Sequence, residues 1–482
     1  MLFSSIVFLF TFLPAVLVLY YLLPERFHNP VLLLASLIFY AWGEPVYIFL
    51  MLLSILFNYF SGLDIARNLT DRRMAKRSLI FNIVVNIAIL GFFKYEGFVL
   101  DSLNAVLPVH ITYHPLALPI GISFYTFQIL SYIIDVYRGN VKVQKNILNF
   151  ALYVTMFPQL IAGPIVQYAD VEEQLVNRES SWDKFGEGCM YFIRGLAKKV
   201  LLANTSGMIF TEVTGLGKGN VSVLSAWLGA FAYMFQIYFD FSGYCDMATG
   251  LGYLFNIHIP MNFNSPYKAT SVVDFWKRWH LTLTRFLRTY VYFPLGGSRK
   301  GEVRTYINII AVFLVSGLWH GANWTFILWG FLHGMGNALT RMFRKQWGHL
   351  HTVIQWGITF LFVNLTWIFF RADSISQAVN FIRRIFGFQS FSVRDGLLNT
   401  FGLKELKFIY CHIPILNRVI ASVHGFDMLI LLTASLILCL VFKNNQEMEF
   451  KPDTKKAVFT VLCLIWGIFS LSGVSEFLYF NF

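Results

Sequence analysis

Apolar stretches long enough to cross a bilayer recur along nearly the whole of this chain, and this feature restricts its fold more than any other. A membrane-spanning helix needs roughly 20 mostly apolar residues, because the hydrocarbon core of a bilayer is about 30 Å thick. The composition agrees, since only 13% of the residues are charged, whereas soluble domains carry about 25%. The sequence therefore predicts an all-α polytopic membrane protein.

The apolar segments fill the chain so evenly that we expect one membrane domain over residues 1–482 and no sizeable soluble domain. They are Leu2–Leu23, Val31–Trp42, Val46–Leu63, Ser78–Phe93, Leu116–Ile134, Ile147–Val166, Tyr191–Ile209, Val221–Phe239, Met247–Ile259, Thr305–Thr340, Ile354–Phe370, Met428–Phe442 and Ala457–Val474. Some are too short or too long for a simple span. We expect about ten to twelve transmembrane helices, with re-entrant and interfacial helices in addition. Val31–Trp42 and Val46–Leu63, which Gly43-Glu44-Pro45 separates, fit a hairpin.

Basic residues predict the orientation of the chain, because cytoplasmic loops carry an excess of Lys and Arg. Five of them crowd the connection Arg67–Arg77, and four more precede the last apolar segment. Both loops are placed in the cytoplasm, which puts the C-terminal Phe482 outside. If the hairpin before the first loop enters and leaves on that same side, the first span begins outside, and two outside termini require an even number of crossings. The net charge is +12, and because Lys and Arg collect in short loops between apolar segments, as the positive-inside bias requires, no nucleic-acid partner is expected. The predicted location is the cytoplasmic (inner) membrane, crossed many times.

Several common signatures are absent from the sequence. The five cysteines form no CxxC or CxxH pair, so neither a disulfide framework nor a metal site is predicted. There is no GxSxG, Walker A, HExxH or strand-linked GxGxxG motif, which leaves hydrolase, ATPase, metalloprotease and dehydrogenase functions without support. The apolar N-terminus lacks a basic region and a cleavage site, so it is read as a retained first span.

The segment Thr305–Thr340 contains no Asp, Glu, Lys or Arg over 36 residues. A straight helix of that length would measure about 54 Å, so the segment must bend, break or re-enter. The expected break is Ser316–Asn323, which contains His320 near the middle of the run. An ionisable group at membrane depth is rare and tends to mark a functional site, so His320 is predicted to be functional rather than a packed core histidine and to lie near the middle of the membrane. For His333 a functional and a structural role stay open, and the neighbouring Gly330–Gly334 spacing indicates close helix packing.

Aromatic and basic residues alternate in Asp274–Lys300, DFWKRWHLTLTRFLRTYVYFPLGGSRK. This pattern is typical of an amphipathic helix at the cytoplasmic interface. A membrane anchor alone does not require a histidine, so His280 needs another explanation. The Gly296-Gly297-Ser298 turn is followed by two basic residues, and it could present backbone N–H groups and positive charge to a phosphate.

Long stretches of the sequence resemble the membrane-bound O-acyltransferases, and in particular the bacterial branch that acetylates alginate and is related to the subunit for teichoic acid D-alanylation. The similar stretches are LPIGISFYTFQILSYIIDVYRG (118–139), MFPQLIAGPIVQY (156–168), GLAKKVLLAN (195–204), QIYFDFSGYCDMATGLG (236–252), NFNSPY (262–267), DFWKRWHLTLTRFLRTYVYFPLGGSRKG (274–301), GLWHGANWTFILWGFLHG (317–334) and WIFFRA (367–372). Three positions depart from the family's usual residues: Cys245, Lys277 and Asn323. The PLGGSRKG ending is more similar to the acetylation type.

The resemblance implies a ring of tilted transmembrane helices around a central tunnel between cytoplasmic and outer funnels. It implies His320 as the catalytic residue and His280 as a second important histidine on the cytoplasmic side. The reaction would move an acetyl group from cytoplasmic acetyl-CoA, a substrate rather than a bound cofactor, to a hydroxyl outside. An extracytoplasmic partner of the SGNH-hydrolase-like type would then acetylate a polysaccharide. The donor-binding candidates are Lys277, Arg278, Arg299 and Lys300, and the tunnel-lining candidates are Trp319, Asn323 and Asp240.

Two alternatives stay open at this point. Within the enzymes, the chain could transfer D-alanine from a carrier protein thioester to a cell-wall polymer. From another class, it could be a transporter or flippase for a glycan or lipid intermediate, although the absence of an internal repeat weakens that reading.

Overall fold

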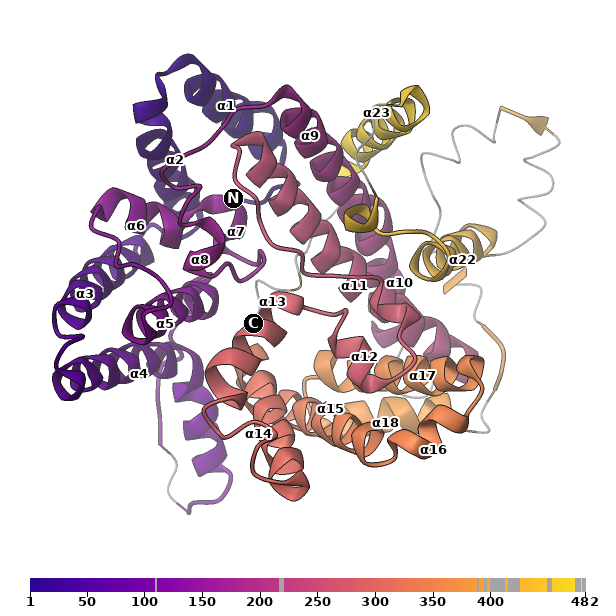
Figure 1. Cartoon of the computed structure of the whole chain (residues 1–482). Helices are drawn as coiled ribbons and strands as arrows, with labels where there is room; N and C mark the ends of the chain where they lie inside the picture. Colours follow the sequence, from indigo (N-terminus) through magenta and orange to yellow (C-terminus); the bar gives the residue numbers. More distant parts are fainter. Residues whose placement is uncertain are drawn as a thin grey trace.

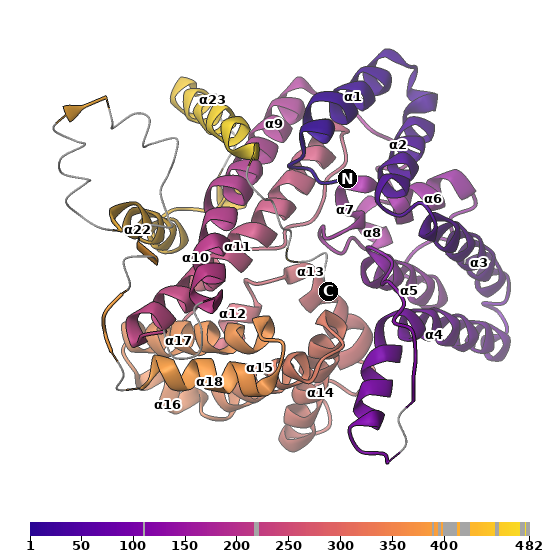
Figure 2. The same cartoon turned by 180° about the vertical axis from the view of Figure 1, so that it is seen from behind.

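A computed structural model of the chain describes residues 1–108, 111–215, 221–387, 390–393, 397–398, 412–414, 425–448, 453–472 and 478. Within these residues all regular elements are helices, except for one isolated antiparallel bridge between Phe263 and Trp279. The prediction of an all-α protein is therefore confirmed for the described part of the chain. Figures 1 and 2 show the helices packed around the short segment α12–α13 near the centre of the molecule.

The helices follow the chain in three groups. The N-terminal group is η1 (Phe8–Phe12), α1 (Leu13–Leu22), η2 (Glu25–Phe27), α2 (His28–Gly43), α3 (Tyr47–Arg67), α4 (Arg72–Asn104), α5 (Ile122–Arg138), α6 (Ile147–Thr155), α7 (Phe157–Leu160) and α8 (Tyr168–Val171). The central group is α9 (Trp182–Ala197), η3 (Lys198–Ala203), α10 (Asn204–Gly215), α11 (Val223–Leu254), η4 (Pro266–Lys268), α12 (Val272–Trp276), α13 (Leu281–Leu287) and η5 (Arg288–Tyr292). The C-terminal group is α14 (Glu302–His320), α15 (Trp324–Met342), α16 (Arg344–His349), α17 (Thr352–Arg371), α18 (Ile375–Ile385), α22 (Phe426–Leu440), η6 (Asn445–Glu447), α23 (Thr454–Phe469) and η7 (Ser470–Ser472).

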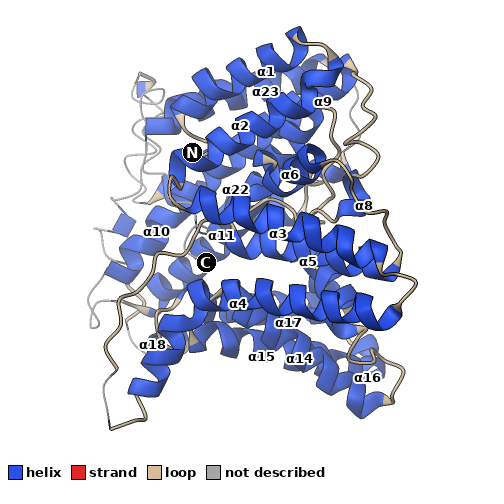
Figure 3. Ribbon diagram, turned by 90° about the vertical axis from the view of Figure 1, so that its left-hand side faces the viewer, coloured by secondary structure: helices blue, strands red, loops and turns tan. Residues whose placement is uncertain are grey.

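Four helices among the described residues are long and apolar enough to cross a membrane: α3, α4, α14 and α17. Two shorter apolar helices cover Phe8–Leu22 and Asp427–Leu440. Many large side chains on these helices are exposed, for example Leu53 and Phe81, and such surfaces suit contact with lipid. α3 and α4 lie side by side (Figure 3). The chain is therefore a membrane protein with several apolar helices.

The expected hairpin is present, because α2 ends at Gly43 and α3 begins at Tyr47. The segment predicted to end at Phe93 is longer than expected, since α4 continues to Asn104. The five basic residues of Arg67–Arg77 lie at the end of α3 and in the first turns of α4, on either side of the short connection 68–71, and their cytoplasmic location stays a prediction. The prediction for Phe482 lies outside the described residues.

Glycines allow the central helices to approach closely. α9, η3 and α10 run along α11 (Figure 2). A Cβ atom at Gly195 would lie 2.5 Å from the carbonyl oxygen of Gly243, and one at Gly250 would lie 2.5 Å from the backbone nitrogen of Phe192. Any side chain at these positions would force the two helices apart, so they form a tight and precisely registered pair.

The long uncharged segment breaks where the sequence predicts. α14 ends at His320, three residues follow, and α15 begins at Trp324 and packs back against α14. A Cβ atom at Gly330 would overlap the carbonyl oxygen of Phe313, which confirms close packing rather than chemistry for the Gly330–Gly334 spacing. The middle of the run is thus the turn of a hairpin, and the depth of His320 in the membrane stays a prediction.

The single amphipathic surface helix expected over Asp274–Lys300 is wrong. The chain forms α12, turns, and then forms α13 and η5. Trp276, Trp279 and His280 are all buried, with at most 5% exposure. The same aromatic and basic residues can form a membrane anchor or a packed turn, and here the rings of Phe275, Trp276 and Trp279 pack into the protein core, whereas Phe293 stays exposed.

Candidate active site

The structure brings His320 and His280 together, although 40 residues separate them in the chain. His320 is the last residue of α14, and His280 directly precedes α13. Their ring centroids lie 6.2 Å apart with an interplanar angle of 61°. Both side chains are buried. Two imidazoles at this separation can act on the same small substrate or exchange a proton through it.

Aromatic rings enclose His320. The ring centroids of Trp319, Trp329 and Phe370 lie 4.9, 5.2 and 5.2 Å from that of His320. The extended Gly321 ends α14 at this point, and a Cβ atom there would overlap the ring of Phe326. The apolar surroundings exclude water and strengthen any electrostatic interaction with a bound substrate.

A buried lysine supports the end of α14, and sequence reasoning missed it. The ammonium group of Lys94 donates to the carbonyl oxygen of Trp319 and, at 3.1 Å, to the hydroxyl of Ser123. The neighbouring Tyr95 hydroxyl donates to the carbonyl oxygen of Leu318 at 2.9 Å. The last carbonyls of a helix lack partners within it, so α4 provides them from outside. An isolated lysine inside an apolar helix is the signal that could have identified this position.

His280 occupies a strained backbone conformation with φ 48° and ψ 55°. A left-handed conformation outside glycine costs about 1–3 kcal/mol and persists only where the surroundings enforce it. Two flanking contacts do so here. The backbone nitrogen of Leu281 donates to the carbonyl oxygen of Asn262 at 3.0 Å, and that of Asn264 donates to the carbonyl oxygen of Arg278 at 2.8 Å.

The side chain of Asn262 completes this support. Its Oδ1 lies 3.1 Å from Nδ1 of His280 and accepts from the backbone nitrogen and the hydroxyl of Thr282 at 3.2 and 2.9 Å. Its Nδ2 lies 3.3 Å from Sγ of Cys245. Nε2 of His280 is buried without a hydrogen-bond partner in the described part of the chain. Burial lowers the pKa of His280 to about 3, because the charged imidazolium is poorly solvated there.

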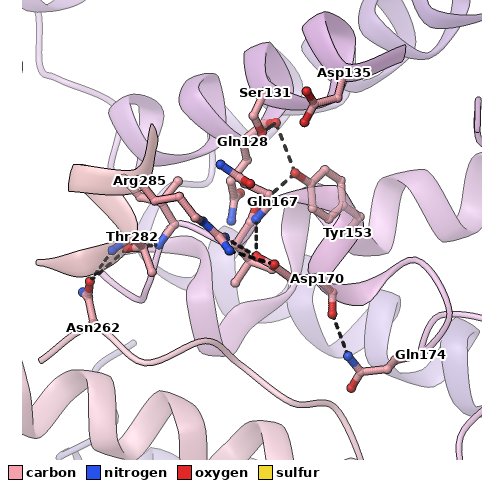
Figure 4. A network of polar contacts seen from close by, with 12 residues as sticks. Gln128, Ser131, Asp135, Tyr153, Gln167, Asp170, Gln174, Asn262, Thr282 and Arg285 are labelled. Atoms are coloured by element: carbon pink, nitrogen blue, oxygen red, sulfur yellow. Dashed lines mark hydrogen bonds and ion pairs between the residues drawn. The ribbon is translucent and has the colours of Figure 1, made fainter. Parts of the chain in front are cut away.

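Figure 4 shows how this support continues away from the histidines. The hydroxyl of Thr282 accepts from the backbone nitrogen of Ile165 at 2.9 Å. One turn further along, the guanidinium of Arg285 forms a two-pronged ion pair with Asp170, which also accepts from the backbone nitrogen of Gln167 at 3.0 Å (Figure 4). Two points are therefore fastened to α13: Ile165, which precedes α8, and Asp170, which lies within α8.

The second histidine of the hairpin, His333, has a structural role. Its Nδ1 accepts from the indole N–H of Trp276 at 3.2 Å, and its Nε2 lies 3.0 Å from the hydroxyl of Thr366. That hydroxyl donates to the carbonyl oxygen of Val363, so it accepts from Nε2–H. Both nitrogens are occupied, which favours packing over a functional role for His333.

The donor-binding candidates lie on two different elements. Lys277 is exposed after α12, and Arg278 is half-buried and pairs with Asp274 at 3.0 Å. Arg299 and Lys300 are exposed in the turn before α14. The left-handed Gly296 and Gly297 shape that turn.

The tunnel-lining candidates differ in their contacts. Trp319 lies beside both histidines, with its ring centroid 6.0 Å from that of His280 and 4.9 Å from that of His320. Asp240 forms a buried ion pair with Lys199 at 2.5 Å and accepts from the backbone nitrogen of Leu478. Asn323 caps α15 through Thr325 and donates to the carbonyl oxygen of Asp373. Only Trp319 of the three is thus placed against the histidine pair by these contacts.

Comparisons with known proteins agree with this site. The sequence model of the membrane-bound O-acyltransferase family matches residues 141–374. A probable alginate O-acetylase of Pseudomonas aeruginosa is 44% identical over 414 residues, which cover 84% of this chain and 78% of the relative. The chain belongs to the membrane-bound O-acyltransferase family.

Other relatives in the same family differ in the acceptors that their names state. A peptidoglycan O-acetyltransferase of Helicobacter pylori is 37% identical, with 100% of this chain and 98% of the relative covered. A teichoic acid D-alanyltransferase of Bacillus subtilis is 27% identical over 64% of this chain and 82% of its own length. The range matched by the family model includes Asn262, His280, His320 and His333, whereas Lys94 lies before that range.

Family membership and these relatives together show that the chain is a membrane-bound acyltransferase.

Proposed function

We propose that this membrane-bound O-acyltransferase takes an acetyl group from cytoplasmic acetyl-CoA and delivers it to a hydroxyl on the outer side of the cytoplasmic membrane, for O-acetylation of a polysaccharide. The observation that carries the proposal is the buried pair of His280 and His320, whose centroids lie 6.2 Å apart. The alginate O-acetylase and the peptidoglycan O-acetyltransferase among the relatives support acetyl as the transferred group and a polysaccharide as the final acceptor.

In the proposed reaction His320 acts as the general base. A hydroxyl attacks a thioester poorly until a base removes its proton, and such help is worth roughly 10²–10⁴-fold. The new C–O bond forms as the C–S bond breaks, and the thiolate of CoA leaves and takes up the proton. His280 is assigned to positioning the thioester or relaying that proton.

The proposal includes an architecture. The whole chain, residues 1–482, forms one domain of about ten to twelve crossings in a ring, and a tunnel joins the two sides. Trp319 lines this tunnel next to the histidines, and Asp240 and Asn323 are further lining candidates. Charged CoA then stays in the cytoplasm, and only its acyl end reaches His320. An extracytoplasmic SGNH-hydrolase-like partner passes the acetyl group to the polysaccharide.

Lys277, Arg278, Arg299 and Lys300 are proposed to bind the phosphates of CoA. Charge-assisted hydrogen bonds to phosphate are roughly twice as strong as neutral ones. The orientation can be tested separately: a single cysteine in the loop Arg67–Arg77 should resist an impermeant thiol reagent on intact cells and react after permeabilisation. Labelling on intact cells would place the donor side outside.

D-alanyl transfer from a carrier protein is the second candidate, since a teichoic acid D-alanyltransferase is among the relatives. Family membership favours both transfer reactions over transport. The deciding experiment supplies reconstituted protein with radiolabelled acetyl-CoA or with a D-alanyl-loaded carrier protein. We expect label transfer from acetyl-CoA only; transfer from the carrier protein alone would establish the second candidate.

A further inference from the structure

Two backbone N–H groups determine which atom of Asn262 faces His280. The backbone nitrogen of Thr282 can only donate, so the Asn262 atom that lies 3.2 Å from it must be the amide oxygen. The backbone nitrogen of Ile165 donates to the hydroxyl of Thr282, so this hydroxyl gives its own proton to the same amide oxygen. The orientation of the Asn262 amide therefore follows from its partners.

The amide oxygen in turn determines the tautomer of His280. An amide oxygen only accepts hydrogen bonds, so the Nδ1 of His280, 3.1 Å away, must carry a proton. A neutral imidazole with Nδ1–H has its lone pair on Nε2. This Nε2 is buried and has no hydrogen-bond partner in the described part of the chain.

Asn262 also replaces His280 as the cap of α13. A residue at the N-cap position commonly accepts a hydrogen bond from the first turn of its helix, but the side chain of His280 does not. Instead Asn262 caps the helix with two of its own atoms. Its backbone carbonyl oxygen accepts from the backbone nitrogen of Leu281, and its side-chain Oδ1 accepts from that of Thr282, the first two residues of α13. The imidazole of His280 is thereby released from a structural role that its position would otherwise impose.

We propose that Asn262 is a positioning residue that locks His280 in the Nδ1–H tautomer and presents Nε2 as a buried proton acceptor beside His320. This inference rests on the proposed function, in which His280 positions the thioester or relays a proton to the leaving thiolate. Two titratable side chains surround the arrangement: His320 from α14, through ring contact, and Cys245 from α11, through Nδ2 of Asn262. As a proton acceptor, Nε2 can receive the proton removed from the attacking hydroxyl and pass it to the departing thiolate, which is the relay assigned to His280 above.

The first test is the substitution Asn262→Asp, which keeps the shape and places a carboxylate against Nδ1–H. A nearby negative charge favours the imidazolium, so the acid limb of kcat/KM should move to higher pH by at least about one unit. Asn262→Leu removes the acceptor, and kcat should fall roughly 10- to 100-fold, as for other residues that orient a histidine, with the acetyl-CoA KM within about twofold. Asn364→Asp is the matched control, since Asn364 is equally buried and bonds the carbonyl oxygen of Ala230; its pH profile should not move.

The second test needs no variant of Asn262 and no substrate. In wild-type protein labelled with 15N-histidine, NMR should show His280 as the Nδ1–H tautomer, with His280→Asn used to assign the signal. An Nε2–H tautomer, an unshifted pH profile in Asn262→Asp, or a folded Asn262→Leu protein with kcat within twofold of wild type would each overturn the inference. Failure of wild-type protein to use acetyl-CoA would instead defeat the proposed function, and the NMR result would still stand.

Discussion

The surroundings of His280 and of His333 belong to one aromatic cluster, but the two histidines differ in how many of their ring nitrogens are hydrogen-bonded. At His333, Trp276 and Thr366 occupy both nitrogens. At His280, Asn262 occupies one nitrogen, and the other has no hydrogen-bond partner among the described residues. Burial is the same in both cases. Burial alone therefore does not mark a reactive histidine. The distinguishing feature is a ring nitrogen without a hydrogen-bond partner that lies next to a second imidazole.

The strongest test of this comparison measures the variant His320→Ala, from the proposed catalytic pair, alongside the variant His333→Ala, from the fully hydrogen-bonded site. Removing the proposed base should lower acetyl transfer roughly 100-fold or more, while the protein still elutes as a folded species in detergent. The measurement is transfer of labelled acetyl groups from acetyl-CoA by purified protein. Activity above a few per cent of wild type in His320→Ala would end the catalytic assignment.

Lys94→Met tests whether the end of α14 must be held for His320 to work. Methionine keeps the length and apolar stem but cannot donate to the Trp319 carbonyl oxygen. Losing a hydrogen bond from a charged donor costs about 1.5–3 kcal/mol. If about half of that stabilisation is lost in the transition state, kcat falls roughly four- to twelvefold. Lys76→Met is the control, because Lys76 is exposed. Equal activity of both variants would show that α14 positions His320 unaided.

The double substitution Arg299→Ala/Lys300→Ala separates donor binding from chemistry. Exposed charge pairs contribute about 0.2–1 kcal/mol each, so the acetyl-CoA KM should rise roughly fivefold and kcat should stay nearly constant. Because salt screens exposed charges, the effect should be larger at low ionic strength. Arg344→Ala/Lys345→Ala removes the same charge from the exposed surface of α16. An unchanged KM with lower stability in detergent would make the turn a membrane anchor.

His333→Ala should have the smallest effect on catalysis. It leaves the indole N–H of Trp276 without an acceptor, and a buried unsatisfied donor costs about 1–3 kcal/mol. We expect a lower melting temperature in detergent and a kcat within about threefold of wild type. A 100-fold loss of kcat in a protein of normal stability would contradict the division between the two regions.

The fold class, the break at Ser316–Asn323 and the candidate histidines could be predicted from the sequence, because they depend on local composition and motifs. The closeness of His280 and His320 could not, since it requires α13 and α14 to meet. Trp279 was expected at an interface and is buried, because local composition does not reveal which surface covers a ring. Lys94 and Asn262 escaped notice because their partners lie far away in the chain, and Asn262 gave no sign of its role within NFNSPY.

The contact between Lys94 and Trp319 has a consequence for biosynthesis. The two residues are 225 positions apart, and at about 5–20 residues per second a ribosome needs about 10–45 s to make that length. During this interval α4 enters the bilayer with a lysine whose final acceptor does not yet exist. At the centre of an inserting helix, where the cost is greatest, lysine costs about 2.5–3.5 kcal/mol, and the apolar residues of α4 must offset the part of that cost that Lys94 incurs. The arrival of α14 then supplies the carbonyl oxygen of Trp319, so the step that anchors His320 also satisfies a donor that lacked its final acceptor early in translation.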